Sequence, residues 1–271
     1  MYPLHLTLLS AVRRAGPILD PEGNLYGTSP YGGVNGIVYE IDSAGEETTL
    51  YNFSGAPGGT TPLAGVARDP AGSIIGATQH GGAANCGVVY IVDSTGRQKA
   101  LYAFTGGTGG LSPESTPVPD CQGNIYGTTV GGGAAGFGTV YEITNSGGET
   151  VLHGFTGDDG GPPVAVTFDS ADNLYGAAGF YGPYDSDVIY KLARSGQFTV
   201  LYSFTGGAGG GGPGDLTLDS AGNDLQAEPV GPGDSRIQPH RSARWRRGRS
   251  QVISRLRCES LPHDFRWRRR R

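Results

Sequence analysis

The sequence predicts an all-β fold assembled from a repeated four-stranded unit, and three observations support this prediction. Landmark residues recur at a nearly constant interval, because Gly27, Gly76, Gly127 and Gly176 are 49, 51 and 49 residues apart. Within each interval apolar residues alternate with polar or small ones, which is the period of a β-strand and not of a helix. Glycine (49 residues) and proline (18 residues) separate the short apolar runs, as is typical of tight turns between strands.

Four strands can be assigned in each unit, and the third unit shows them in order. Its first strand is predicted near 115–120, its second over 125–130, its third over 139–144 and its fourth over 150–157. The third strand reads IVYEI, VVYIV, TVYEI and VIYKL in successive units, and the fourth reads LYNF, LYAF, LHGF and LYSF. A period near 50 residues with four strands per unit indicates propeller blades or solenoid units.

The turn between the first and second strands has its own signature, Asp-x-x-Gly-Asn/Ser. The aspartate accepts hydrogen bonds from nearby backbone N–H groups, and the glycine supplies the positive φ that closes the hairpin. In the fourth unit Asp169 keeps its place, whereas Asp172 replaces the glycine.

The aromatic residues indicate how the units pack. On the third strand Tyr39 and Ile41 share one face, and on the fourth strand Tyr51 and Phe53 share one face, with the same pattern in each later unit. Large aromatic side chains opposite small residues allow twisted sheets to stack face to face. The sequence therefore predicts a β-propeller of about four four-stranded blades. Propellers usually close with four to eight blades, so four is at the lower limit, and an incomplete or open propeller is expected. A β-solenoid is the alternative, although its coils are usually much shorter.

The repeats divide the chain into three parts. The repeat domain is predicted at 16–225, with units at about 16–55, 56–106, 107–157 and 158–206 and a partial unit at 207–225. Residues 1–15 are interpreted as the remnant of a preceding repeat or as a closing strand. They do not fit a signal peptide, because their arginines follow the apolar run instead of preceding it. No apolar stretch approaches the length that spans a membrane.

The last part, 226–271, is predicted to be a disordered arginine-rich tail. It holds 13 arginines and four acidic residues, a charge of 13 − 4 = +9, whereas the preceding residues carry 7 − 21 = −14. Glycine codons read one base out of phase encode arginine and tryptophan, so we interpret RWRRRR as a frameshifted glycine run. The alternative is a basic arm for nucleic acid or a membrane surface. The acidic body disfavours a nucleic-acid partner through charge repulsion.

The sequence offers little catalytic chemistry. No Ser–His–Asp set and no histidine cluster with metal-ligand spacing can be assembled, so we expect no catalytic residues and no cofactor. His153 occupies the place of a strand tyrosine and is interpreted as a tolerated aromatic substitute. The acidic loops would offer carboxylates to Ca²⁺, but solvated turns are the preferred interpretation. These loops contain Asp158, Asp159, Asp185 and Asp187.

The second strand is the expected ligand-facing element. It reads LYGTS, IIGAT, IYGTT and LYGAA, which places hydroxyl groups and small residues on the strand predicted to be innermost. Thr28, Thr78 and Thr128 are the expected ligand-facing residues, together with His80 in the glycine loop that follows the second strand of the second unit. Threonine hydroxyls suit hydrogen bonding to a sugar or peptide more than acid–base catalysis.

The unit LYGTS/TT…GG…VYEI…LYxF(S/T)G resembles the Gloeobacter/Verrucomicrobia-type tandem repeat, GloVer, over about Asp20 to Asn223. The resemblance implies a propeller-like, secreted or cell-surface protein and implies no catalytic residues. We therefore expect a non-catalytic scaffold that binds an extracellular ligand, either carbohydrate or protein. The alternative is a propeller lyase or hydrolase that acts on a sugar or lactone, since the aspartate turns are also similar to those of propeller lactonases.

Overall fold

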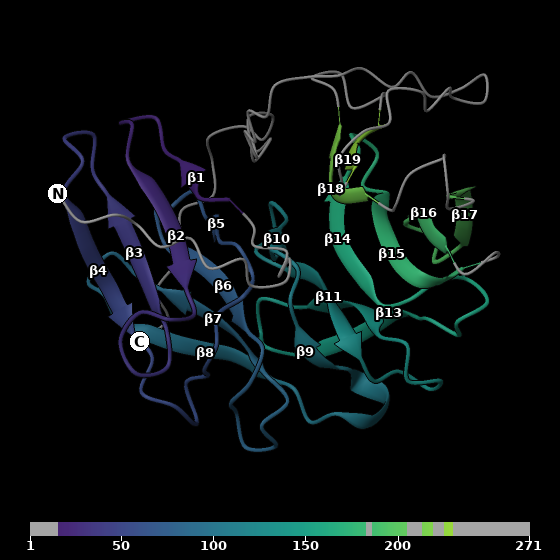
Figure 1. Cartoon of the computed structure of the whole chain (residues 1–271), viewed down its shortest axis with the longest axis horizontal. Coiled ribbons are helices and arrows are strands. Elements are labelled where there is room, and N and C mark those ends of the chain that lie inside the picture. The colour runs from purple at the N-terminus through teal and green to yellow at the C-terminus, as the bar shows by residue number, and fades with distance from the viewer. Residues whose placement is uncertain (1–15, 183–185, 205–212, 219–224, 230–271) are drawn as a thin grey trace, which may run out of the picture.

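The computed structural model describes residues 16–182, 186–204, 213–218 and 225–229 (Figure 1). Four antiparallel sheets follow one another along the chain, and each has its strands in sequence order. The only helical element among the described residues is one 3₁₀ turn, η1, at Gly107–Gly109. The predicted all-β, propeller-like fold is confirmed, and we call the four sheets blades 1 to 4.

The strands of the first two blades have the following bounds. Blade 1 contains β1 (Ile18–Leu19), β2 (Leu25–Ser29), β3 (Ile37–Ile41) and β4 (Glu47–Asn52). Blade 2 contains β5 (Ala67–Arg68), β6 (Ile74–Thr78), β7 (Val88–Val92) and β8 (Gln98–Ala103).

The next two blades repeat this order with longer second strands. Blade 3 contains β9 (Leu111–Pro113), β10 (Val118–Pro119), β11 (Ile125–Gly131), β12 (Thr139–Ile143) and β13 (Glu149–Gly154). Blade 4 contains β14 (Pro163–Phe168), β15 (Leu174–Gly182), β16 (Ser186–Leu192) and β17 (Phe198–Ser203).

A two-stranded hairpin follows blade 4, made of β18 (Pro213–Leu218) and β19 (Leu225–Pro229). Strand β19 extends to Pro229, past residue 226, where the arginine-rich tail was predicted to begin, and the boundary of that tail stays a prediction. The hairpin register persists after the repeat motif has ended, with Leu218 opposite Leu225 and Leu216 opposite Ala227. The predictions for 1–15 and 230–271 lie outside the described residues.

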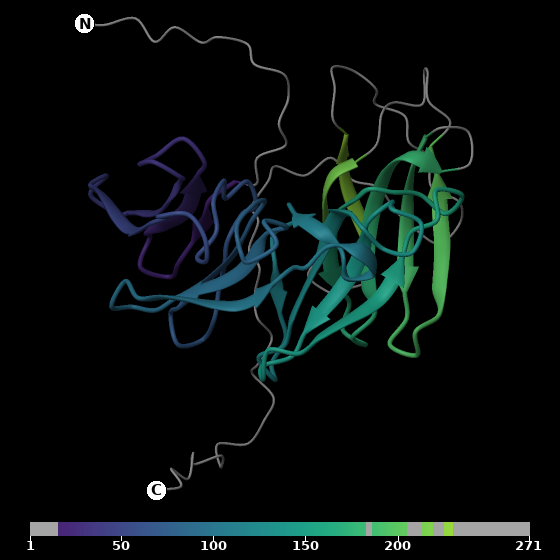
Figure 2. The same ribbon diagram turned by 90° about the horizontal axis from the view of Figure 1, so that it is seen from below.

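The blades lie side by side in an arc, from blade 1 (purple) at one end to the hairpin at the other (Figure 1). The view from below shows the same succession (Figure 2). Among the described strands, none of blade 1 pairs with the hairpin. Neighbouring blades meet through their first and second strands, since β11 lies against β14 and β14 lies against β18. The first strands therefore form the inner edge of an open arc.

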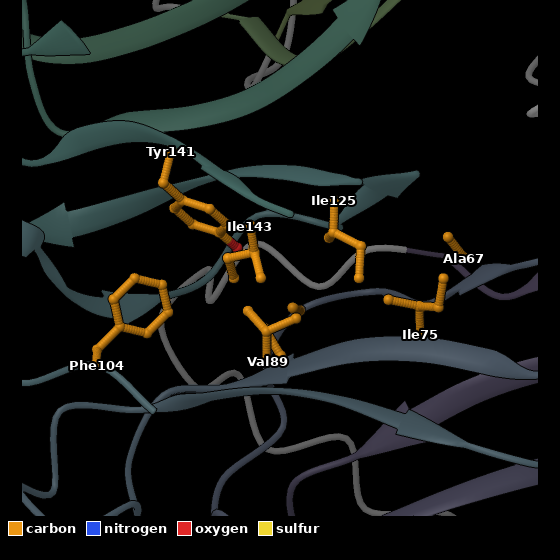
Figure 3. Close-up of a cluster of buried hydrophobic side chains, with 9 residues drawn as sticks. Ala67, Ile75, Val89, Phe104, Ile125, Tyr141 and Ile143 are labelled. Atoms are coloured by element: carbon orange, nitrogen blue, oxygen red, sulfur yellow. The ribbon is translucent and has the colours of Figure 1, made fainter. Parts of the chain in front are cut away.

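An aromatic pair crosses each seam between successive blades. Phe53 meets Tyr90 with ring centroids 5.0 Å apart, Phe104 meets Tyr141 at 5.1 Å, and Phe155 meets Tyr190 at 5.3 Å, all edge to face. The rings are fully buried, and Figure 3 shows Phe104 and Tyr141 with Val89, Ile125 and Ile143 around them. Such pairs contribute about 0.5–1.5 kcal/mol each beyond the burial of their area. The prediction that each unit buries its aromatics against the next copy is confirmed.

Glycine and proline bring the backbones of neighbouring blades together. Gly87 has φ +103° and lies against Pro113 of the next blade, so closely that a side chain at Gly87 would overlap the proline ring. Gly36 meets Pro62 and Gly138 meets Pro163 in the same way. The glycine carbonyl also accepts a hydrogen bond from a buried phenylalanine N–H, as Gly87 does from Phe104 at 2.9 Å. The glycine-rich composition thus reflects a contact made at every seam.

Candidate functional site

Each blade has two ends that differ in chemistry. At the first end, which we call the turn edge, the Asp-x-x-Gly-Asn/Ser turn joins the first strand to the second. At the opposite end, which we call the loop edge, a glycine-rich loop joins the second strand to the third. The loop-edge segments that follow β2, β6 and β11 are 30–36, 79–87 and 132–138.

The carboxylates of the turn edge are engaged in closing the turns. Asp20 Oδ1 accepts the Asn24 N–H at 2.8 Å, and Asp69, Asp120 and Asp169 repeat this bond. The predicted mechanism of the turn is confirmed, including a positive φ of 61° at Asp172 in place of glycine.

The turn of blade 1 also holds charged partners. Tyr26 Oη donates to Asp20 Oδ2 at 3.1 Å, and Arg68 of blade 2 forms an ion pair with the same oxygen at 3.3 Å. Burial alone would raise the pKa of Asp20, but the bonds from Asn24 and Tyr26 and the charge of Arg68 outweigh burial and lower it. These groups stabilise the fold and leave little free capacity for a ligand.

The three predicted threonines are engaged in packing. Thr28 is half-buried and donates to the Ala64 carbonyl of the next blade at 2.8 Å. Thr128 is buried and donates to the Pro163 carbonyl of the next blade at 3.2 Å. Thr78 is also buried and donates to the His80 carbonyl at 2.9 Å. Their burial and bonds favour a structural role for these hydroxyl groups.

The structure places these threonines in two sets that the sequence reasoning had merged. The second strand pairs with the third in the same register in blades 2 and 3, with Gly76 opposite Tyr90 and Gly127 opposite Tyr141. Thr78 therefore corresponds to Thr129. Thr128 corresponds instead to Ala77 of blade 2. The second strand is also not the innermost one, because the short first strands lie between it and the edge of each sheet.

His80 lies at the loop edge beside a polar pair that joins blades 2 and 3. Gln79 Nε2 donates to Glu114 Oε1 at 2.6 Å, and His80 is half-buried next to Gln79. Burial raises the pKa of Glu114, while the bond from Gln79 and the nearby charge of His80 partly offset this rise. We call Gln79, His80 and Glu114 the polar seam.

Glu114 reaches this position because the first strand of blade 3 is interrupted. Pro113 pairs with Thr129 and Val118 pairs with Tyr126, so five steps on the first strand (118 − 113) face three on the second (129 − 126). The two extra residues leave the ladder and place Glu114 against blade 2. Next to it, Ser112 has a positive φ of 55°, and the equivalent Thr61 has 57°. Non-glycine residues held in this region are enriched at functional sites.

Gln79 and Glu114 were missed by the sequence reasoning, although a comparison of equivalent positions would have found them. Gln79 stands three residues after the landmark glycine, where the other units have Pro30, Val130 and Gly179. Glu114 follows the seam proline, where the neighbouring seams have Leu63 and Val164. At the two equivalent seams these positions are apolar, and at the polar seam they carry an amide and a carboxyl group.

The described part of the acidic loops brings no set of calcium ligands together. Asp159 Oδ2 contacts His153 Nε2 at 2.9 Å, and its Oδ1 accepts the Thr156 N–H and hydroxyl. Asp158 is exposed, Asp187 is buried, and Asp185 lies outside the described residues. No group of three or more His, Cys, Asp or Glu side chains that could hold a metal ion occurs in the described part of the chain. His153 stacks on Phe198 at 3.8 Å and packs edge to face with Phe155, as an aromatic substitute would.

No helix within the described ranges has the length and apolar character that would carry it across a bilayer.

Two solved structures share this fold. One, described as "the putative gluconolactonase", has a TM-score of 0.52 and 11% identity, over 78% of this chain and 72% of that chain. The other is the extracellular domain of a "putative one component system" from B. thetaiotaomicron, with a TM-score of 0.51 and 14% identity. It aligns over 78% of this chain and 25% of its own length. At these identities the likeness shows the fold alone.

The curated proteins contain no match to the chain. The family model of the Gloeobacter/Verrucomicrobia repeat, however, matches residues 12–225. This range includes all four blades, the aspartate turns and the seam glycines. The chain therefore belongs to the Gloeobacter/Verrucomicrobia repeat family.

Proposed function

We propose that this protein is a non-catalytic binding scaffold that holds an extracellular ligand at the loop edge, over the polar seam. The observation that carries this proposal is that Gln79 and Glu114 stand at one seam where the other seams have apolar residues, although the seams are built alike. Packing alone explains Leu63 and Val164 at the equivalent positions. A carboxyl group at that position adds a polar group to the loop edge that the packing between blades does not require.

The chemistry of the polar seam suits a carbohydrate. An amide, a carboxyl and an imidazole group offer both donors and acceptors, which is what the hydroxyl groups of a sugar require. The recurring threonine hydroxyls are committed to backbone carbonyls, so they do not compete for this role. A protein ligand that presents hydroxyl or amide groups would use the same contacts.

We also propose that the protein is secreted or displayed on the cell surface. The likeness to an extracellular domain supports this location, as does the resemblance of the repeat to those of exported proteins. Fractionation of the native host, with antibody detection of the protein outside intact cells, tests it.

The binding proposal is tested with the full chain on an array of oligosaccharides and soluble polysaccharides. We expect one class of glycan to bind, and Glu114→Ala and His80→Ala to weaken that binding at least tenfold. Arg97→Ala is the matched control, because Arg97 is exposed in a turn of the same blade, away from the loop edge. Equal binding by Glu114→Ala and native protein would exclude the polar seam as the site.

A second candidate function is that of a lactone or sugar hydrolase or lyase. The observation that favours it is the raised pKa of Glu114 beside His80, because a carboxyl group that keeps its proton closer to neutral pH suits general acid catalysis. The likeness to the structure described as a gluconolactonase points the same way, although a shared fold does not establish a shared activity. Hydrolysis of a panel of aldonolactones that is lost in Glu114→Gln, while ligand binding persists, would establish this alternative.

A further inference from the structure

The loop edge of blade 1 carries an exposed aromatic ring. Tyr31 and Val34 lie in the loop-edge segment 30–36 and are 72% and 93% exposed. The other large apolar side chains that are exposed within the described ranges lie on β1, β13 and β17 and not in a loop-edge segment. The segments 79–87 and 132–138 of blades 2 and 3 expose only small or polar residues. Exposed apolar side chains that gather at one place are typical of a binding surface.

The fold does not require a ring at this position. Tyr31 stands four residues after Gly27, where blade 2 has His80 and blade 3 has Gly131. Blade 3 keeps the same strand order although glycine has no side chain to pack there. Tyr31 and His80 are each followed by two glycines, so the two rings occupy equivalent positions on neighbouring blades.

Thr61 connects the loop of blade 1 to the polar seam. Its φ is +57°, and its N–H donates to the Asn35 carbonyl at 2.9 Å. Its carbonyl accepts the Gln79 N–H at 3.0 Å. The backbone of the blade 1 loop is therefore two hydrogen-bonded steps from the polar seam, about 10 Å at the usual spacing of strands. One ligand that is longer than a single sugar ring can reach both.

We propose that Tyr31 is a second contact for the ligand held at the polar seam, and that this ligand is a neutral glycan with β-linked pyranose rings and equatorial hydroxyl groups. The inference rests on the function proposed above. A pyranose ring of this kind turns its C–H groups toward its two faces, and such a face packs on the flat side of an aromatic ring. Tyrosine offers this surface at a low cost in conformational entropy.

The hydroxyl groups of the same sugar point outward from the rim of its ring. They remain available to the amide, carboxyl and imidazole groups of the polar seam, which supply both donors and acceptors. Tyr31 thus binds through apolar contact and the polar seam through hydrogen bonds.

The charge of the chain favours a neutral glycan over an anionic one. The residues up to 225 carry 7 − 21 = −14, and one of these carboxyl groups, Glu114, belongs to the polar seam. A glycan that carries carboxylate or sulfate groups would be repelled by this charge.

The experiment measures the binding of cellohexaose and xylohexaose to the full chain by isothermal titration calorimetry. We expect at least one of them to bind and Tyr31→Ala to weaken this binding at least fivefold. Tyr31→Phe, which keeps the ring, should recover most of the lost affinity. Leu201→Ala is the matched control, because Leu201 is also an exposed apolar residue (47%) but lies on β17 of blade 4. Nitration of Tyr31, followed by mass spectrometry, should decrease when the hexasaccharide is bound.

The outcomes separate this inference from the function on which it rests. Native affinity in Tyr31→Ala, or an equal loss in Tyr31→Phe, would overturn the role of the ring and leave the polar seam in place. If neither hexasaccharide binds but another glycan does, and Glu114→Ala abolishes that binding, the glycan class is wrong and the polar seam stands. If no glycan binds, both proposals fail. A loss in Tyr31→Ala but not in Glu114→Ala would remove the polar seam and leave Tyr31 as the glycan contact.

Discussion

The ring of Tyr90 lies directly over the α-carbon of Gly76 on the neighbouring strand, and its hydroxyl group occupies the space that a β-carbon would need. Gly127 with Tyr141 and Gly176 with Tyr190 repeat the arrangement. The landmark glycine and the strand tyrosine of the repeat are therefore one structural unit.

This contact predicts that Gly76→Ala destabilises the fold. The new methyl group would overlap the Tyr90 ring and displace it from the seam, which we expect to lower the free energy of unfolding by about 1–3 kcal/mol. Urea unfolding measures the effect. Gly154→Ala is the control, because nothing lies closer than 4.0 Å to its added β-carbon, and an equal loss there would contradict the argument.

A second prediction concerns the buried tyrosine hydroxyl groups. The hydroxyls of Tyr90, Tyr141 and Tyr190 have no hydrogen-bond partner among the described residues. An unpaired buried polar group is costly, so we expect Tyr141→Phe to raise the free energy of unfolding by about 1 kcal/mol. Tyr126→Phe provides the opposite case, because the Tyr126 hydroxyl donates to Glu142 at 3.0 Å and its removal should destabilise. Similar changes in the two variants would refute this explanation.

A third prediction is a pH dependence at Glu149. Burial raises the pKa of its carboxyl group, and the bond from Tyr102 at 2.7 Å offsets only part of the rise. A raised folded-state pKa means that stability is greatest below the pKa of the unfolded chain, about 4.3, and falls as the pH rises through the folded value. Glu149→Gln should therefore be more stable than the native protein near pH 7, and the difference should vanish near pH 3.

Blade 2 already has a glutamine at the position equivalent to Glu149. This residue, Gln98, donates a hydrogen bond to the Gly58 carbonyl at 3.2 Å. Urea unfolding from pH 3 to pH 8 gives the comparison. A constant difference between Glu149→Gln and native protein over that range would exclude the carboxyl group as its cause.

A fourth prediction concerns Asp20, whose pKa is lowered. The carboxylate contributes stability above the pKa of the unfolded aspartate, about 3.9, and this contribution is lost as the pH falls through the lower folded value. At pH 7, Asp20→Ala removes the turn bond from Asn24 and leaves Arg68 without its ion-pair partner, so we expect a loss of about 2 kcal/mol. Glu22→Ala is the control, because Glu22 is an exposed acidic residue of the same turn and its replacement should change the stability little.

Much of the fold could be predicted because it repeats. The spacing of Gly27, Gly76 and Gly127 predicted the length of the repeat. The two-residue alternation predicted the strands, and the aspartate turns predicted the hairpins between them. Repetition multiplies a weak local signal, since a pattern present four times is not accidental. The continuation of β19 to Pro229 is not visible in the repeat, because backbone pairing needs only a partner strand and not the repeat motif.

The candidate site could be predicted only in part, because its residues do not recur from one repeat to the next. His80 was identified because it breaks the repeat inside a glycine loop. Glu114 was not, since its importance depends on two extra residues in the first strand that bring it to Gln79 of another blade. Thr28 and Thr128 donate their hydroxyl groups to carbonyl groups of the next blade, whereas Thr78 donates within its own blade, and the ligand-facing role of all three stays a prediction.

The phenylalanine that closes each seam belongs to one repeat and its tyrosine partner to the next. A gene duplication that begins anywhere within the unit therefore preserves every such pair, provided that it copies a whole period. A gain or loss of half a unit would set two phenylalanine ends, or two tyrosine faces, against each other. Internal duplications and deletions in such chains should accordingly preserve the seams only when they span whole blades.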